Sequence, residues 1–135
     1  MSPDNARANA AAEMTRADES LRAATLLLRE GLYNNAVSDA CYAAFHAVRA
    51  LLFTFGEEPR SHRGALHLFN VRFVRTGKMD ARHLSTLARA QYDRVNADYG
   101  ARVRFTADDA NDEISGARAL IEATRDLLRQ DGWLS

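Results

Sequence analysis

One predicted helix combines an apolar stripe with an arginine and a carboxylate at helical spacing. Leu84, Leu87, Gln91, Arg94 and Asp98 lie three or four residues apart, so on a helix they share one face. Arg94 and Asp98 can therefore form an ion pair. Such a pair is either a partly exposed contact that contributes roughly a few tenths of a kcal/mol, or an arginine oriented to hold a phosphate. The spacing alone favours the first interpretation.

A second polar and aromatic stripe precedes it in the chain. Asp39, Tyr42, His46, Arg49 and Phe53 also recur at helical spacing. This stripe could face an acidic or nucleotide ligand, line a dimer interface, where tyrosine and arginine are enriched, or be half-buried packing with polar tips. The last two interpretations are favoured.

Other residues that could do chemistry stand alone. His62 lies at a predicted helix start, on the face of Leu66 and Phe69, where a hydrogen-bonded structural histidine is the common outcome. Cys41 is the one cysteine, which excludes an internal disulfide or multi-cysteine zinc site and favours a buried packing role. The chain contains no phosphate-binding glycine loop, paired-histidine zinc motif or Gly-x-Ser-x-Gly motif. We therefore expect no cofactor and no metal.

The elements that position these residues are helices. Apolar residues recur at helical spacing almost throughout, without a convincing period-two strand, so we expect an all-α fold. On the fourth helix, Leu84, Ala88, Gln91 and Val95 form the predicted stripe. Short connections favour antiparallel neighbours and hence an up-and-down bundle of four to five helices. The first predicted helix ends at Gly31, and the last starts at Thr106. Between them we expect a second helix from Tyr33 to about Phe55, a third from Ser61 to Gly77, and a fourth from Asp80 to Gly100.

The chain has the size of one domain. Its 135 residues, 47% hydrophobic and 27% charged, are typical of a single globular unit rather than a disordered chain. We expect an N-terminal extension over residues 1–12, one helical domain over 13–130, and a C-terminal tail over 131–135. The apolar runs are too short to predict a transmembrane helix, and residues near the N-terminus lack a signal-peptide pattern. The cytoplasm is the expected location.

Charge is unevenly distributed, although the formal net charge is zero. The stretch 60–92 has seven lysines or arginines against one acid, and the stretch 105–131 has seven acids against three arginines. The basic stretch could bind nucleic acid or an acidic partner. A solvated helix face or complementarity between subunits explains it equally well.

Five short segments, in this order, resemble landmarks of HEPN domains, in the branch often encoded beside minimal nucleotidyltransferases. Together with the last predicted helix, the likeness covers nearly everything after Met14. The segments are Glu30–Ala36, Cys41–Leu52, Ser61–Gly64, Phe73–Gly77 and Arg94–Tyr99.

The resemblance implies a bundle of four or five helices, a homodimer and, in many members, RNA cleavage by the toxin half of a toxin–antitoxin pair. The ribonuclease motif of the family is an arginine followed after four to six residues by a histidine, with both side chains meeting across the dimer. Arg94 matches, but Tyr99 stands where the histidine would. Tyrosine can hydrogen-bond a phosphate, yet its pKa near 10 makes it a poor base at neutral pH. His62 and His46 are candidates to replace the histidine.

Three hypotheses follow. The first is a homodimeric HEPN protein that binds a minimal nucleotidyltransferase, and RNA or a nucleotide, in a toxin–antitoxin-like pair. The second is a metal-independent ribonuclease toxin, and the third is a helical interaction module without a ligand. The residues assigned to a reaction are Arg94, His62, Asp98 and Tyr99, and those assigned to ligand binding are Arg94, Tyr42, His46 and Arg49.

Overall fold

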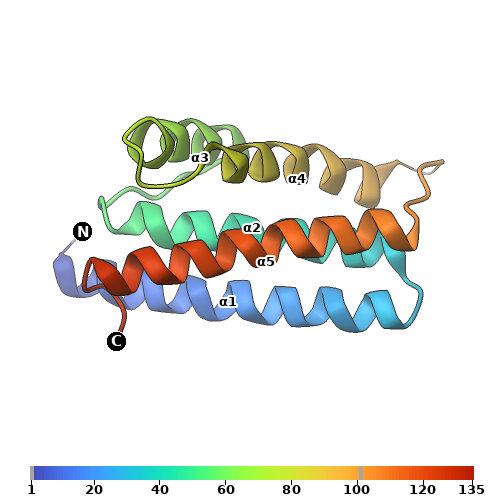
Figure 1. Cartoon of the computed structure of the whole chain (residues 1–135), viewed down its shortest axis with the longest axis horizontal. Coiled ribbons are helices and arrows are strands. Elements are labelled where there is room, and N and C mark those ends of the chain that lie inside the picture. The colour runs from blue at the N-terminus through green and yellow to red at the C-terminus, as the bar shows by residue number, and fades with distance from the viewer. Residues whose placement is uncertain (1, 101) are drawn as a thin grey trace.

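A computed structural model describes residues 2–100 and 102–135, and every regular element in these ranges is helical. This confirms the predicted all-α bundle. In Figure 1, α1 lies below α2 and α5, and α3 and α4 form a layer above them. The elements are α1 (Pro3–Arg29), α2 (Tyr33–Phe53), α3 (His62–Phe69), the π-helix η1 (Asn70–Val74), α4 (Ala81–Tyr99) and α5 (Ala107–Gln130).

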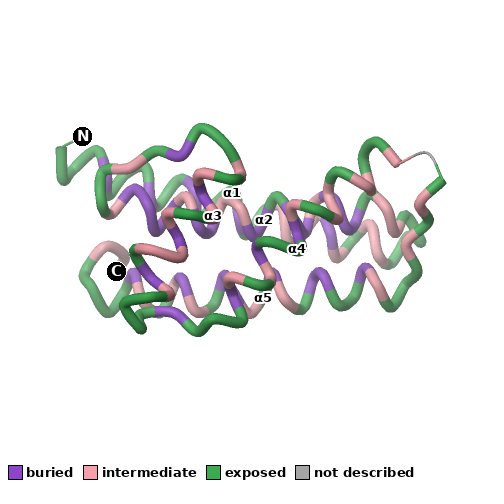
Figure 2. Tube along the Cα trace, turned by 90° about the horizontal axis from the view of Figure 1, so that it is seen from above, coloured by how far each residue is buried: buried purple, intermediate pink, exposed green. Residues whose placement is uncertain are grey.

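The central helix is α2, which packs against α1, α3, α4 and α5. Several neighbours can approach it because its buried side includes alanines that are almost completely inaccessible to solvent. Figure 2 shows buried residues recurring along the long helices, with exposed residues between them. The buried alanines of α2 are Ala36, Ala40, Ala43, Ala44, Ala47 and Ala50.

Among the described residues, α2 has the length and apolar composition to cross a membrane, although the short apolar runs predicted no such helix. In the structure, 72% of its apolar window is buried by the rest of the bundle. Its apolar character is therefore accounted for by its place in the core.

The helix ends follow the sequence signals. Ser61, Asp80 and Thr106 are N-cap residues whose side chains each accept a backbone N–H. Thr106 and Asp109 form a capping box at the start of α5, with hydrogen bonds of 3.1 and 2.8 Å. Gly31 ends the turn after α1 with a φ of 76°, which glycine adopts without steric cost.

The third helix differs from its prediction. Instead of one helix that ends at Gly77, α3 ends at Phe69 and continues as the wider turn of η1. In this turn the N–H of Arg75 donates to the carbonyl of Asn70 over 2.8 Å. Phe69 and Phe73 both remain buried across the change, with ring centroids 6.1 Å apart.

The predicted core stripe of the fourth helix is wrong. The structure buries His83, Leu87 and Ala90, whereas Ala88 and Val95 are exposed. Apolar residues occur on two sides of α4, so helical periodicity did not decide which side faces the core. Contact with α2 decides it.

Both chain ends pack onto the bundle. The helix α1 begins at Pro3, and Ala6 is buried, so residues 3–12 of the expected extension continue this helix. Residue 1 lies outside the described residues. At the other end, the Arg7 guanidinium donates to the carbonyl of Gly132 and lies 5.3 Å from the centroid of the Trp133 ring.

The first prediction concerns α2. Ala44→Leu should lower the free energy of unfolding by about 1–3 kcal/mol, because Ala44 has no exposed surface and the added atoms must displace packed neighbours. Ala12→Leu on the exposed side of α1 is the control, with an expected change within about 0.5 kcal/mol. Urea unfolding followed by circular dichroism measures both. Equal stability of the two variants would contradict the close packing of α2.

Candidate functional site

Arg94 is held in one orientation between α4 and α2. Its Nη1 donates to Asp98 Oδ2 and to the hydroxyl of Tyr42, each over 3.3 Å. Its Cζ also lies 5.2 Å from the centroid of the Tyr42 ring. The side chain is only 14% exposed, and its Nε is buried without a hydrogen-bond partner in the described part of the chain. The ion pair is therefore formed as predicted, and it leaves N–H donors of the guanidinium unused.

His62 lies in the same region. Its ring packs on Phe45, with centroids 4.2 Å apart, and it lines a cavity of about 200 Å³ between α3 and α4 together with Leu87 and Gln91. Burial, and then the positive charge of Arg94, lowers the pKa of His62 below its usual value. The imidazole is therefore neutral at pH 7 and able to accept a proton.

Tyr99 does not join this group. It is 78% exposed at the end of α4. Five residues after Arg94, it is rotated by about 140° around the helix axis, since an α-helix turns by about 100° per residue. The spacing that resembles the family motif therefore places Tyr99 and Arg94 on different sides of α4.

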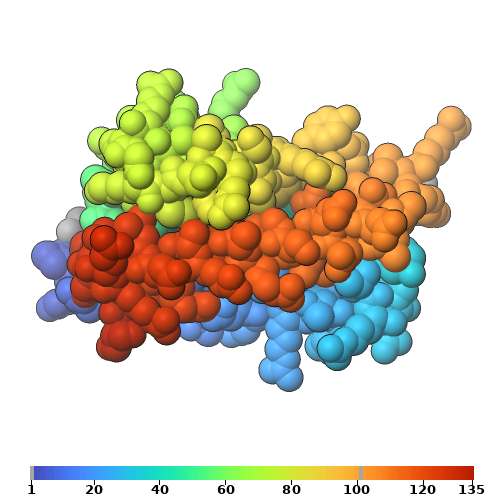
Figure 3. All heavy atoms as spheres, in the orientation of Figure 1, coloured from blue at the N-terminus to red at the C-terminus, as the bar shows by residue number. Residues whose placement is uncertain are grey.

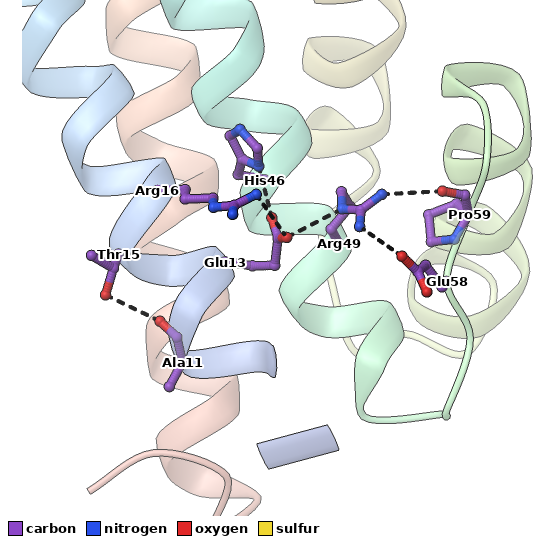
Figure 4. Close-up of polar contacts among 8 residues, drawn as sticks. All are labelled: Ala11, Glu13, Thr15, Arg16, His46, Arg49, Glu58 and Pro59. Carbon is purple, nitrogen blue, oxygen red and sulfur yellow. Dashed lines mark hydrogen bonds and ion pairs between the residues drawn. The ribbon is translucent and has the colours of Figure 1, made fainter. Parts of the chain in front are cut away.

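The predicted stripe on α2 is divided between two clusters. Tyr42 contacts Arg94, whereas His46 and Arg49 contact Glu13 of α1 (Figure 4). His46 Nδ1 lies 2.7 Å from Glu13 Oε2, and Arg49 Nε lies 3.4 Å from Glu13 Oε1. Arg49 also donates to the carbonyl of Pro59 over 3.2 Å. His46 and Arg49 thus join α1, α2 and the loop after α2.

Glu13 was not identified from the sequence. Its side chain is 7% exposed. Burial alone raises the pKa of Glu13, but the His46 hydrogen bond and the charges of His46, Arg49 and Arg16 together lower it below the usual value. The carboxylate is therefore ionised at neutral pH. Its position in the sequence could have indicated that it is buried, because Glu13 lies at helical spacing between the buried residues Ala10 and Ala17.

A second buried carboxylate lies where α2, α4 and α5 meet. Burial, a hydrogen bond with Asp93 and the charge of Asp93 raise the pKa of Glu113 to about 8. Arg89 Nε lies 3.4 Å from it. Cys41 Sγ is 4.0 Å from Glu113 Oε2, and burial also raises the pKa of this thiol. Cys41 is buried, as predicted, and is a packing residue rather than a thiolate nucleophile.

The far side of Asp98 opens into a polar cavity. It has a volume of about 440 Å³ and is lined in part by Asn34, Ser38, Asp39 and Asp98. Burial, and then the charge of Asp98, raises the pKa of Asp39. Two neighbouring carboxyl groups repel a phosphate. An anionic ligand of Arg94 would therefore approach from the side of α3 and His62.

The basic stretch lies on α3, η1 and the start of α4. Arg72 is paired with Glu57 at 2.7 Å, and Arg89 contacts Asp93 and Glu113. The remaining basic residues are exposed and make no ion pair within residues 2–100 and 102–135. We call these residues the basic layer: Arg60, Arg63, Arg75, Lys78 and Arg82.

A comparison with the profiles of known families identifies the family of this chain. The profile of the HEPN domain matches residues 10–127. Since this match covers most of the chain, the chain belongs to the HEPN domain family, as the resemblance predicted.

Relatives of similar length support this assignment. A protein of Methanocaldococcus jannaschii named "Putative toxin MJ0605" is 31% identical over 114 residues, which are 84% of each chain. A UPF0332 protein of Thermotoga maritima is 35% identical over 113 residues, or 84% of this chain and 86% of that protein. A UPF0332 protein of Gloeobacter violaceus is 30% identical over 118 residues, or 87% of this chain and 94% of that protein.

The second prediction concerns Glu13. Glu13→Gln should lower the free energy of unfolding by about 1–3 kcal/mol at pH 7, because His46 and Arg49 lose the charged partner of their hydrogen bonds. The pKa of Glu13 is lower in the folded state, so its contribution is complete above the unfolded value of 4.5 and is lost as the pH falls below it. Urea unfolding at pH 7 and pH 3.5 measures the difference.

Glu19→Gln, on the exposed side of α1, is the matched control and should change stability little. A Glu13→Gln variant as stable as the wild type at pH 7 would show that the cluster does not stabilise the bundle.

Proposed function

We propose that this HEPN protein acts in a toxin–antitoxin-like pair in the cytoplasm, as a homodimer that binds a minimal nucleotidyltransferase and RNA or a nucleotide. The observation that supports binding of RNA or a nucleotide is the fixed orientation of Arg94. Asp98 and Tyr42 hold its guanidinium through Nη1, which leaves Nη2 to donate to a ligand. Arginine binds phosphate through such donors, and an arginine that is already ordered loses less side-chain entropy on binding. The toxin names of relatives from M. jannaschii support the proposed pair.

The basic layer supports a polyanionic ligand. Its five cations lie on the elements that flank His62, and no neighbouring carboxylate neutralises them by an ion pair in the described part of the chain. An RNA strand bound along this layer would reach Arg94 from the side away from Asp39. RNA fits this path better than a free nucleotide does, because several phosphates are needed to use several separate cations.

The third prediction concerns this layer. RNA affinity should fall steeply as salt rises from 50 to 200 mM, because each phosphate contact releases counterions. Replacing Arg75 and Lys78 together by alanine should reduce the slope of log K against log salt by roughly one to two. Fluorescence anisotropy with labelled single-stranded RNA measures the slope.

Arg22→Ala and Arg129→Ala, on the exposed sides of α1 and α5, are controls that should leave the slope unchanged. RNA affinity independent of salt, or no RNA binding, would contradict the proposed use of the basic layer. Binding of a free nucleotide alone would favour the nucleotide as ligand.

A second candidate function is metal-independent cleavage of RNA. The observation that favours it is the position of His62, which lines a cavity together with Gln91 of α4 and whose pKa is lowered by burial and then by the charge of Arg94. In such a reaction the RNA 2′-hydroxyl loses its proton to His62 and its oxygen forms a bond to phosphorus. The bond to the 5′-oxygen then breaks, this oxygen takes a proton from water, and a 2′,3′-cyclic phosphate and a 5′-hydroxyl result. Arg94 stabilises the negative charge on the phosphoryl oxygens. Within one chain Tyr99 is turned away from Arg94, so only Tyr99 of a second copy could reach this group.

The fourth prediction separates binding from cleavage. Arg94→Ala should weaken RNA binding at least about tenfold in either case, whereas Arg94→Lys should retain part of the binding through its charge. If the protein is a ribonuclease, His62→Ala should also reduce the cleavage rate at least about a hundredfold. If it only binds RNA, His62→Ala should alter affinity alone. Anisotropy and gel analysis of labelled RNA measure both quantities.

His67→Ala is the matched control, because His67 is an exposed histidine on the same helix. Circular dichroism of every variant tests folding. Unchanged RNA binding in folded Arg94→Ala would make Arg94 a structural residue and favour a helical interaction module without a ligand.

A further inference from the structure

The outward face of α4 is apolar and exposed. Tyr92 is 71% exposed, Val95 is 42% exposed and Tyr99 is 78% exposed. In Figure 3, α3 and α4 form the upper side of the molecule, and no other described helix lies above them. Large apolar side chains gathered on one helix face mark an interaction surface rather than a solvated one.

The exposed residues of this face have small side chains in the first half of α4 and large side chains in the second half. The small residues stand nine, five and two positions before Ala90, and the large residues stand two, five and nine positions after it. All six are exposed. We call them the α4 face: Ala81, Ser85 and Ala88, then Tyr92, Val95 and Tyr99.

We propose that the α4 face binds a second copy of the chain through a two-fold axis near Ala90, with the two α4 helices antiparallel. Each large residue then lies opposite a small residue of the partner, and Tyr92 lies opposite the partner subunit's Ala88. A two-fold axis repeats each such pair, so one match in the sequence produces two matches in the interface. The inference rests on the proposed homodimer and assigns its surface, in place of the stripe whose His46 and Arg49 are bound to Glu13.

Charge favours the same orientation. Within one chain Arg89 pairs with Asp93, and Arg94 pairs with Asp98. The exposed Arg82, in the first half of α4, makes no ion pair in the described part of the chain. The C-terminal end of a helix also bears a partial negative charge. Antiparallel packing places Arg82 of each helix beside the negative C-terminal end of its partner, while parallel packing would place the two negative ends together.

The length of α4 and the adjoining cavity set the extent of the surface that a second copy could cover. A stable dimer buries roughly 800 Å² of each partner, which is about a tenth of the 7489 Å² accessible surface of this chain. A helix of 19 residues is about 28 Å long. Next to Ala88, the face continues into a cavity of about 420 Å³ lined by Leu66 and Leu84, among others. The partner subunit's Tyr92, opposite Ala88, would pack at the edge of this cavity.

The second copy would also complete the candidate site. Ala88 and Leu66 line the adjoining cavity that contains His62 and Gln91. The Oε1 atom of Gln91 is buried there without a hydrogen-bond partner in the described part of the chain. The partner subunit's Tyr92 would stand at the edge of this cavity and add a phenolic hydroxyl to its lining, leaving it open to a ligand. Two such sites would then lie on either side of the two-fold axis.

The fifth prediction exchanges one large and small pair. Ala88→Tyr places tyrosine against tyrosine, and Tyr92→Ala places alanine against alanine, so each single variant should weaken the dimer at least about tenfold. The double variant, with Ala88→Tyr and Tyr92→Ala, restores one tyrosine and one alanine in every pair and should recover most of the affinity. Sedimentation velocity of the wild type and the three variants over a concentration series measures the dissociation constants.

Ala12→Tyr and Leu26→Ala, at exposed positions of α1, are controls that should leave the dimer unchanged. A monomeric wild type at micromolar concentration, single variants that dimerise normally, or a double variant that stays as weak as the singles would overturn the proposal. If the α4 variants altered only RNA binding, the face would contact RNA instead. If the wild type dimerises but does not bind RNA, the proposed ligand is wrong and the proposed dimer surface is unaffected.

Discussion

Close packing around α2 is the constraint on which the rest of the structure depends. One helix contacts α1, α3, α4 and α5, and it can do so because small side chains line its buried surfaces. Alanine adds little volume and loses no side-chain entropy on burial. The cost is that α2 has few positions left for polar chemistry. Its Tyr42, His46 and Arg49 lie at the edges of these contacts and reach residues of other helices.

Two buried acids show how the bundle accommodates charge in different ways. Glu13 remains ionised because His46, Arg49 and Arg16 surround it. For Glu113, burial and the neighbouring Asp93 outweigh the single cation Arg89 and raise the pKa to about 8, so it is protonated at neutral pH. In a medium of low dielectric constant, a carboxyl group either gains cationic partners or keeps its proton. The first arrangement joins helices, whereas the second places an uncharged donor between them.

The candidate site and the exposed face belong to the same helix. The inner side of α4 presents Arg94 toward α2, and its outer side presents Tyr92 and Tyr99 to solvent. The cavity beside His62 lies between these two sides. The contact with α2 orients the Arg94 side chain, and the outer side of α4 remains accessible to another molecule. This arrangement explains why α4 is less deeply buried than α2.

Local signals in the sequence determined the helices and their ends. Ser61, Asp80 and Thr106 cap helices because their side chains bond to backbone groups within the same turn, and these contacts need no other element. The pairing of Arg94 with Asp98 is local for the same reason. Tertiary packing decided which side of α4 faces the core, that Tyr42 contacts Arg94, and that Glu13 binds His46 and Arg49. These contacts join residues distant in the chain, and helical spacing defines the faces of one helix without specifying the neighbour of each face.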